Sequence, residues 1–586
     1  MFDTYFAAHP LGEVRYAPQF PPMADRAAWE GVSPEDRADL LSLAETWRAR
    51  PYPLLTAGMY AAFVRTGSRR DCETPYFDRR RKLCAAALHM CLTGTEDSLP
   101  AVEDGLMLIC EESAWGISAH LGLSAAHPFP DERHTVLDLF AAQTGMVLSF
   151  VCQLLEGVLH PDLVERVRRE VERRVLRHFM ENDGEWWMGY VRKDLNNWTP
   201  WIISNVLMAA NVWHYGGAAL IERACMMLDR YLAVVPADGG CDEGAGYWNM
   251  AGGAFLDCLM VLEAMAGIAL FQEEKVRRMM AYPEKVHLGG GWFANFADCD
   301  ARPWLSGERL QYAGERTGNA ALIRMGEEMR TPPSLELSDT VHLSRLLMRL
   351  FGRHPQATLA ELPPKDVWLP DLQLRILRRG EMTVAIKGGH NAENHNHNDV
   401  GSFLLMARGD MRLVDAGNMV YTAKTFSDRR YELWNCRSVY HNVPIIGGAE
   451  QQPGRDFAAR DVKCLPDGLR LDMGGAYPAE AGVTRCVREL RLTLGRMTLT
   501  EEVALLEDKP VTWVFMLRHA PVIGERTVTL GVDGPRLTWD APLTPQVEQL
   551  DITDDRMRRS YPGVLWRLML TAPCSKEHRV KFTIEA

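Results

Sequence analysis

The stretch ELPPKDVWLPDLQLRILRRG, residues 361–380, marks a change in the hydrophobic pattern of the chain. Before it, apolar residues recur at helical spacing in at least ten segments, as in VERVRREVERRVLRHF (164–179). After it, short segments alternate apolar and polar residues and end at glycine or aspartate, as in EMTVAIKGG (381–389). The pattern therefore predicts an all-helical domain over residues 1–362, followed by an antiparallel β-sandwich over residues 363–586.

The composition is that of an ordinary globular protein with an acidic surface. A chain of 586 residues is too long for a single core and should form two to four domains. Its 65 basic and 77 acidic side chains give a net charge of -12, which argues against general binding to nucleic acid or to anionic membranes. Two arginine-rich runs, 79–82 and 166–174, are expected to be solvent-exposed helix faces.

The cysteines and the N-terminal residues bear on the cellular compartment. The 13 cysteines are scattered singly without a CxxC pair, so neither a disulfide framework nor a thiolate zinc site is predicted. Residues 1–18 show no basic leader followed by an apolar core. The longest apolar stretch, 248–271, is interrupted by Asp257 and Glu263 and is interpreted as a buried helix. We expect a cytoplasmic protein, with a trimmed leader as the alternative.

The six residues NHNHND (394–399) form the most polar short stretch of the β-rich half. His395 and His397 are two apart, so their rings share one face if the segment is extended. Asp415 lies one hairpin further on, on the predicted strand MRLVDAG, and His441 follows in SVYHNVP. Two imidazoles and a carboxylate from this set would suit a divalent transition metal, zinc first. The alternative is a polar turn whose side chains bond to their own backbone.

Aromatic, basic and amide side chains alternate in EWWMGYVRKDLNNWTPWIISN (185–205) of the helical half. Aromatic faces stack on sugar rings, and the basic side chains of Arg192 and Lys193 attract anionic groups. The amides of Asn196 and Asn197 can donate hydrogen bonds to a carboxylate. The segment therefore indicates either a site for an acidic sugar or a helix junction packed with tryptophans.

A glycine-rich loop, GGCDEGAGYW (239–248), forms the third group of candidate functional residues. Its glycines let the backbone approach a ligand closely, and it presents Asp242, Glu243 and Tyr247 before a predicted helix. A flexible connection between two helices is the alternative interpretation.

These segments resemble the heparinase II/III-like polysaccharide lyases in three blocks. The blocks are NNWTPW (196–201), DEGAGYW (242–248), and the region from NHNHNDVGSF through LVDAG to YHNVP (394–444). The resemblance implies an N-terminal (α/α) toroid, or incomplete barrel, followed by a C-terminal antiparallel heparinase II/III-like β-sandwich. This is the order that the hydrophobic pattern indicates.

The resemblance also implies β-elimination from a polysaccharide that contains uronic acid. Extra negative charge builds on the substrate carboxylate when the C5 proton leaves, and Asn197, with Asn196 beside it, would stabilise that charge. Tyr247 would act as base and acid on one face of the sugar ring. His395 would act as the base when the other uronate epimer presents its proton from the opposite face.

The same resemblance assigns different roles to the two histidines of NHNHND. His395 corresponds to the catalytic histidine, whereas His397, Asp415 and His441 correspond to the ligands of a structural metal ion, usually zinc, with manganese as the alternative. Since neighbours two apart on a regular strand share a face, we expect the segment to be bent at Asn396, or the metal to lie close enough for one face to serve both roles.

Further residues are candidates for substrate binding on chemical grounds. Trp198 and Arg192 would contact the sugar, Glu243 would orient Tyr247, and Arg429 would pair with a sulfate or carboxylate group. The expected partner is an anionic polysaccharide or oligosaccharide, with glycosaminoglycans such as hyaluronan, chondroitin and heparan sulfate first and alginate second. The oligomeric state is left open, with a homodimer as one alternative.

Two other functions compete with the lyase. An (α/α)-toroid hydrolase of uronides would use Asp242 or Glu243 as its general acid, but it needs a second carboxylate across the bond, and the sequence offers no clear partner. A non-catalytic carbohydrate-binding protein would need no acid and base, which leaves Tyr247 and His395 unexplained. The sequence leaves open which polyuronide is cleaved and whether the action is endo or exo.

Overall fold

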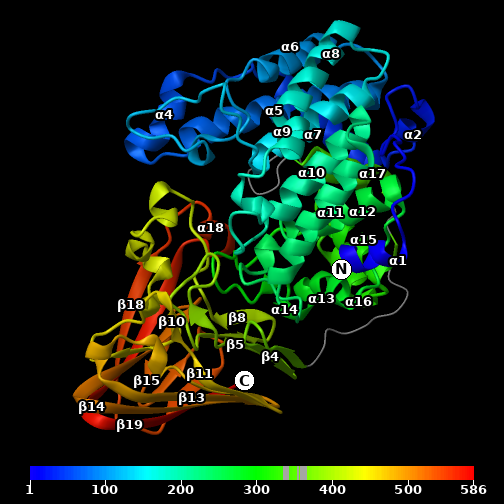
Figure 1. Cartoon of the computed structure of the whole chain (residues 1–586). Coiled ribbons are helices and arrows are strands. Elements are labelled where there is room, and N and C mark those ends of the chain that lie inside the picture. Colours follow the sequence, from blue (N-terminus) through cyan, green and yellow to red (C-terminus); the bar gives the residue numbers. More distant parts are fainter. Residues whose placement is uncertain (334–341, 353–354, 357–365) are drawn as a thin grey trace. The chain divides into compact units, whose positions relative to one another are not determined.

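The structure is a computed structural model that describes residues 1–333, 342–352, 355–356 and 366–586. It divides into a helical unit and a β unit (Figure 1). The helical unit comprises Met1–Val235, Asn249–Met280 and Trp304–Ala360, and the β unit comprises Pro236–Trp248, Ala281–Pro303 and Glu361–Ala586. The predicted boundary between residues 362 and 363 lies outside the described residues. Two segments of the predicted helical domain, 236–248 and 281–303, belong instead to the β unit.

The helical unit is built from α-helices joined by short connections. Its helices are α1 (Phe2–Ala8), α2 (Arg26–Glu30), α3 (Pro34–Arg48), α4 (Ala57–Thr66), α5 (Arg70–Thr93), α6 (Leu99–Cys110), α7 (Leu139–Leu154), α8 (Pro161–Val171), α9 (Arg177–Glu181), α10 (Trp198–Trp213), α11 (Gly217–Val234), α12 (Gly252–Ala266), α13 (Glu274–Met280), α15 (Gly307–Thr317), α16 (Ala320–Glu328) and α17 (Leu343–Phe351).

An inner row of helices forms the core of this unit. Helices α5, α7, α10 and α12 pack one against the next, and almost every residue of α7 and α10 is buried. A helix that is apolar on all sides is one that neighbours surround. By contrast, α8 buries only a stripe that includes Val167 and Val171, and exposes charged residues on its other face. This two-layer arrangement is that of the predicted (α/α) toroid.

The basic run at residues 79–82 is not exposed, so that prediction is wrong. The run lies in α5, an inner helix, and all four side chains are buried. Arg80 Nη2 lies 2.7 Å from Glu112 Oε2, and Arg79 Nη1 lies 3.3 Å from Glu112 Oε1. A buried carboxylate thus neutralises part of the run, which the helical spacing alone did not reveal. The second run begins on α8 and continues into the π-helical turn Glu172–Leu176; it exposes Arg168 but buries Arg174.

Helix α12 contains most of the longest apolar stretch. Residues Ala245–Ala266 are long and apolar enough to cross a membrane by length and composition alone, but 78% of an apolar 18-residue window within them is buried inside the protein. Its two acidic residues have arginine partners, because Asp257 pairs with the buried Arg309 and Glu263 pairs with Arg316. The predicted buried helix is confirmed.

The β unit consists mainly of antiparallel strands, with the short helices α14 (Tyr282–Val286) and α18 (Met557–Ser560). Its strands are β1 (His287–Gly289), β2 (Trp292–Phe293), β3 (Asp366–Leu369), β4 (Leu374–Arg379), β5 (Met382–Lys387), β6 (His390–Asn391), β7 (Phe403–Ala407), β8 (Asp410–Leu413), β9 (Pro444–Ile446), β10 (Gly454–Ala458), β11 (Arg460–Leu465), β12 (Gly468–Asp472), β13 (Val483–Thr493), β14 (Arg496–Leu517), β15 (Val522–Gly524), β16 (Thr527–Thr529), β17 (Arg536–Trp539), β18 (Thr544–Asp551) and β19 (Val564–Glu585).

Two long strands organise the sandwich. Strands β14 and β19 have 22 residues each and pair along their length, from Arg496 opposite Glu585 to Leu517 opposite Trp566. The first part of β14 also pairs with β13, and its last part pairs with β9 and β8. Alternate side chains of these strands enter a shared apolar core with those of β5 and β7. The predicted fold class, a helical toroid followed by an antiparallel β-sandwich, is confirmed.

Candidate functional site

The NHNHND stretch follows β6 and has no regular secondary structure. Its backbone turns at His395, which has the left-handed φ of +55° that non-glycine residues seldom adopt. The expected bend therefore falls one residue before Asn396. As a result, the rings of His395 and His397 both reach the carboxylate of Asp298, with distances of 2.9 Å from His395 Nδ1 and 3.0 Å from His397 Nε2.

Asp298 reaches the histidines because glycines let two other loops pack against its segment. Gly244, in the glycine-rich loop, has a φ of +87°, and a Cβ there would lie 2.6 Å from the Cβ of Cys299. Gly417 has a φ of +69°, and a Cβ there would lie 2.5 Å from the carbonyl oxygen of Cys299. Only glycine allows both the backbone angle and the close approach at these two positions.

The carboxylate of Asp298 is fully buried and remains charged. Burial alone would raise its pKa, but hydrogen bonds from His395 and His397, with the positive charge of Arg430, hold the pKa well below its usual range. Arg430 Nη2 lies 2.8 Å from Asp298 Oδ1. The side-chain amide of Asn418 donates to the Asp298 carbonyl at 3.1 Å and fixes the backbone of the same residue.

Three other side chains surround the partly exposed ring of His395. The hydroxyl oxygens of Tyr247 and Tyr421 lie 3.5 Å and 3.3 Å from His395 Nδ1, and the two hydroxyls are in contact with each other. Glu243 Oε2 lies 3.3 Å from His395 Nε2. The structure thus brings together the predicted residues Tyr247, His395 and Glu243, and adds Tyr421 and Asp298 to them.

The surroundings of Tyr247 favour its neutral, protonated form. Burial, followed by the neighbouring Tyr421 and Asp298, raises the pKa of the phenol well above its ordinary value, and Arg556 opposes this only in part. Burial also raises the pKa of Tyr421. In the free protein Tyr247 is therefore better suited to donate a proton than to remove one.

The three predicted metal ligands also lie together. Atoms of His397, Asp415 and His441 that could bind a metal are within 4.8 Å of one another, and all three side chains are buried. Asp415 Oδ2 accepts a hydrogen bond from His441 Nδ1 at 2.8 Å. His397 Nδ1 and His441 Nε2 are buried without a hydrogen-bond partner among the described residues. Two such nitrogens beside a carboxylate fit a zinc site, because a bound metal would satisfy both of them.

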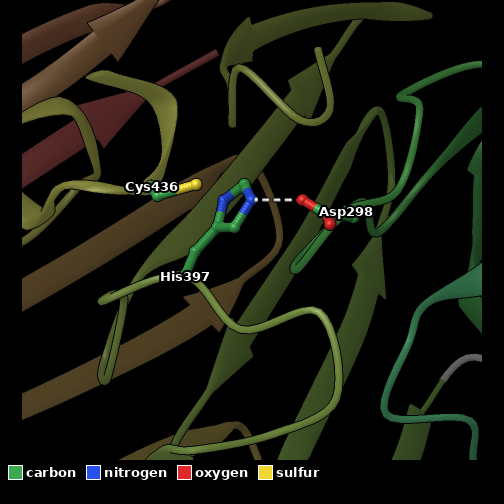
Figure 2. Close-up of side chains that lie close together, drawn as sticks. All are labelled: Asp298, His397 and Cys436. Atoms are coloured by element: carbon green, nitrogen blue, oxygen red, sulfur yellow. Dashed lines mark hydrogen bonds and ion pairs between the residues drawn. The ribbon is translucent and has the colours of Figure 1, made fainter. Parts of the chain in front are cut away.

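His397 belongs to a second group that could also hold a metal. Its members are Asp298, His397 and Cys436, and Figure 2 shows Asp298 and Cys436 on opposite sides of the imidazole ring. Because Nε2 of His397 is bonded to Asp298, Nδ1 is the nitrogen available to a metal. Sequence reasoning missed both Asp298 and Cys436, although the glycine run 289–291 signals a break in the helical pattern near the first of them.

The predicted residues of the NNWTPW block lie in the helical unit. Asn197 is buried at the residue before α10, and Asn196 Oδ1 accepts a hydrogen bond from the backbone of Trp198 at 3.1 Å. The ring of Trp198 lies 5.1 Å from that of Trp186 and 4.7 Å from that of His120. The helical unit thus holds an aromatic group next to the two amides.

Arg192 belongs to the same aromatic group. Its guanidinium lies 5.0 Å from the centre of the Trp186 ring, and its Nε donates to Asp194 Oδ1 at 2.9 Å. Because the side chain is about half exposed, it can contact a ligand without a large desolvation cost.

Two other predicted residues have different surroundings. Arg429 is exposed and pairs with Glu432 at 2.8 Å, whereas the next residue, Arg430, is the arginine that binds Asp298. Asp242 Oδ2 accepts hydrogen bonds from the backbone and the side chain of Asn394, at 3.2 Å and 2.8 Å. Asp242 therefore holds the start of the NHNHND stretch.

Comparison with known proteins places these residues in a family. Residues 361–549, which contain NHNHND, Asp415 and His441, match the family model described as Heparinase II/III-like, C-terminal. This part of the chain is a heparinase II/III-like domain. The predicted resemblance to the heparinase II/III-like polysaccharide lyases is thereby confirmed. No curated protein sequence matches the chain.

Solved structures with the same fold include several lyases. A heparinase III structure is 13% identical, with a TM-score of 0.62 over 96% of this chain and 93% of that one. The heparan sulfate lyase of Pedobacter heparinus is 13% identical, with a TM-score of 0.56 over 96% and 92%. The chondroitin AC lyase of Streptomyces coelicolor A3, in complex with chondroitin sulphate, is 13% identical, with a TM-score of 0.55 over 96% and 82%. At these identities the likeness establishes the fold.

A buried charge cluster of the heparinase II/III-like domain predicts a pH-dependent stability. Lys387 Nζ lies 2.8 Å from Glu393 and 2.9 Å from Asp399. Burial and the charges of Asp399 and Asp242 raise the pKa of Glu393 to about 7, and Lys387 opposes this only in part. In the folded state Glu393 therefore keeps a proton at pH values where the unfolded chain loses it. Its contribution to the free energy of unfolding is full below the unfolded pKa and is lost as the pH rises towards 7.

Glu393→Gln should remove that dependence. Between pH 4.5 and pH 7, deprotonation of Glu393 should lower the wild-type free energy of unfolding by up to about 3 kcal/mol. The variant, which has no carboxyl group at this position, should not show this decrease. Urea unfolding of both proteins across this range measures the difference. Glu450→Gln, which removes a partly exposed partner of Arg437, is the control and should behave as the wild type does. Equal pH slopes for Glu393→Gln and the wild type would contradict the prediction.

Proposed function

We propose that the protein is a polysaccharide lyase that cleaves uronic-acid-containing chains by β-elimination and leaves unsaturated uronate ends. The observation that carries this proposal is the pair of Tyr247 and His395, whose ring centres are 4.5 Å apart. Elimination needs an acid and a base within reach of one sugar residue. A protonated phenol beside a partly exposed imidazole meets that need.

The proposed roles follow from the surroundings of each group. His395 removes the C5 proton, and Tyr247 donates a proton to the departing glycosidic oxygen. In the alternative route, for the other uronate epimer, Tyr247 does both. Neutralisation of the substrate carboxylate is assigned to Asn197, with Asn196 beside it, and this assignment rests on the resemblance of NNWTPW to the family.

A divalent metal, zinc first and manganese second, is proposed at His397, Asp415 and His441. When bound, it would supply no acid or base, but would fix three loops of the domain to one another. The support is the pair of buried nitrogens, His397 Nδ1 and His441 Nε2, that lack hydrogen-bond partners among the described residues.

The substrate class is proposed to be the glycosaminoglycans. Two observations support it: the aromatic and basic group of Trp186, Trp198 and Arg192, and the likeness to lyases whose names specify heparan sulfate and chondroitin. Clustered aromatic rings with a nearby guanidinium suit a sugar that carries negative charge. Alginate-type polyuronides are the second choice.

The hydrolase alternative finds less support in the surroundings of its candidate residues. Hydrolysis needs two carboxylates that flank the scissile bond, with space for water or a nucleophile. Asp242 is bonded to Asn394, and Glu243 faces His395, which Asp298 holds from its other nitrogen. Glu243 and Asp298, the two carboxylates nearest the imidazole, therefore contact the same histidine ring. They are not arranged on opposite sides of a scissile bond.

A panel of polyuronides tests the proposal. The purified protein should generate the ultraviolet absorbance of a conjugated unsaturated uronate from hyaluronan, chondroitin sulfate, heparan sulfate or alginate. New reducing ends without that absorbance would indicate a hydrolase instead. Binding without any cleavage would indicate a carbohydrate-binding protein.

A further inference from the structure

We infer that Asp298 is a positioning residue that orients both the catalytic histidine, His395, and the metal-ligand histidine, His397. The inference rests on the proposed function and adds to it a residue from a segment, 281–303, that lies outside the matched heparinase II/III-like residues. One carboxylate would then couple the metal cluster to the acid–base pair.

The geometry gives each oxygen of Asp298 its own imidazole. Oδ2 lies 2.9 Å from His395 Nδ1, and Oδ1 lies 3.0 Å from His397 Nε2. An ionised carboxylate only accepts hydrogen bonds, so each of these nitrogens carries its hydrogen. The remaining nitrogens are then set for different tasks. Nε2 of His395, which lies 3.3 Å from Glu243 Oε2, is the one left to exchange a proton, and Nδ1 of His397 is the one that would bind a metal.

Arg430 contacts both Asp298 and the backbone of the NHNHND stretch. Its Nη2 donates to Asp298 Oδ1 at 2.8 Å and to the carbonyl of His395 at 2.9 Å, and its Nε donates to the carbonyl of Asn396 at 2.9 Å. The guanidinium therefore ties the backbone of the NHNHND stretch to the carboxylate that its side chains contact. Together these bonds support the left-handed backbone at His395.

The backbone around Asp298 is similarly constrained. Ala297 has a φ of +64°, an uncommon angle for alanine, and Asn418 holds the carbonyl of Asp298. The close approaches at Gly244 and Gly417 fix the segment from both flanks. A carboxylate that is held this firmly can restrict the rotation of two rings, which a mobile surface aspartate cannot do.

The variant Asp298→Asn tests the inference, because it keeps the shape of the side chain and removes its charge. Metal affinity should be measured by competition with a chelator, using zinc as the probe, and kcat and KM on the polyuronide that the wild type cleaves. Zinc affinity should fall about 10-fold to 100-fold, because a ligand's supporting hydrogen bond is weakened. At saturating zinc, kcat should still be reduced about 10-fold or more, with KM changed by less than about threefold.

Asp410→Asn is the matched control. Asp410 is also a paired aspartate of the β unit, with Arg518 and His519 as partners, and it contacts neither histidine of the site. Its zinc affinity and kcat should equal those of the wild type. If Asp298→Asn loses its cooperative thermal transition, Arg430→Lys replaces it, and both zinc affinity and kcat should again fall.

Each other outcome overturns the inference. Full recovery of kcat at saturating zinc would mean that Asp298 acts on the metal cluster alone. Unchanged zinc affinity with a reduced kcat would mean that it acts on His395 alone. If the wild type cleaves no polyuronide, the proposed function fails, and unchanged zinc affinity in Asp298→Asn would still overturn the link to His397.

Discussion

Tyr247→Phe should abolish β-elimination, with kcat reduced by at least about 1000-fold. The phenol hydroxyl lies 3.5 Å from His395 Nδ1, and its removal leaves the leaving oxygen without the proposed acid while the aromatic ring keeps its packing. The initial rate of ultraviolet absorbance gives kcat, and circular dichroism with thermal unfolding shows whether the fold is retained.

The matched control for this variant is Tyr440→Phe. Tyr440 belongs to the same unit, where it packs against Trp434 and lies under Arg567. Removal of the Tyr440 hydroxyl should leave kcat within about twofold of the wild-type value. A Tyr247→Phe protein that kept more than about a tenth of the wild-type kcat would show that another group is the acid. Tyr421, which touches the Tyr247 hydroxyl, would be the next candidate.

His441→Ala should abolish binding of the proposed metal and lower the free energy of unfolding by at least about 3 kcal/mol. The imidazole is completely buried, so the change removes a proposed ligand, takes the histidine partner from Asp415, and opens a cavity. Elemental analysis of the purified proteins gives both the metal content and the metal's identity. Urea unfolding, with and without added zinc, gives the change in stability.

His519→Ala is the control for the metal experiment. His519 pairs with Asp410 and is about one-third exposed, so its removal should leave the metal content unchanged. After metal has been removed with a chelator, added zinc should raise the free energy of unfolding of the wild type but not that of His441→Ala. Full metal occupancy in His441→Ala would rule out the assigned ligand set.

The hydrophobic pattern was sufficient to predict the fold because each half of the chain follows one period. Helices such as α8 and α11 have the predicted amphipathic spacing, and the strands after residue 366 alternate as predicted. The pattern was insufficient for the run 79–82, where Arg79 and Arg80 pair with Glu112, a residue that follows α6. Such partners are distant in sequence, and neither spacing nor composition identifies them.

The residues of the candidate site were likewise predicted only in part. Tyr247, His395, His397, Asp415 and His441 were predicted because they lie in recognisable blocks, and the structure brings the first two together and the last three together. Asp298 and Tyr421 were missed, as was the contact of Arg430 with Asp298. Asp298 lies outside the three blocks, Tyr421 and Arg430 lie between the LVDAG and YHNVP motifs of the third, and all three reach the site because of loop packing.

The long strands of the sandwich have a consequence for how the protein folds. Strands β14 and β19 pair residues as far apart as Arg496 and Glu585, and both also pair with several other strands. Contacts between residues so distant along the chain give the sandwich a high contact order, which goes with slow folding. The loops that carry His397, Asp415 and His441 therefore acquire a rigid frame only after this distant pairing is complete, and the metal-binding geometry should be among the last features to form.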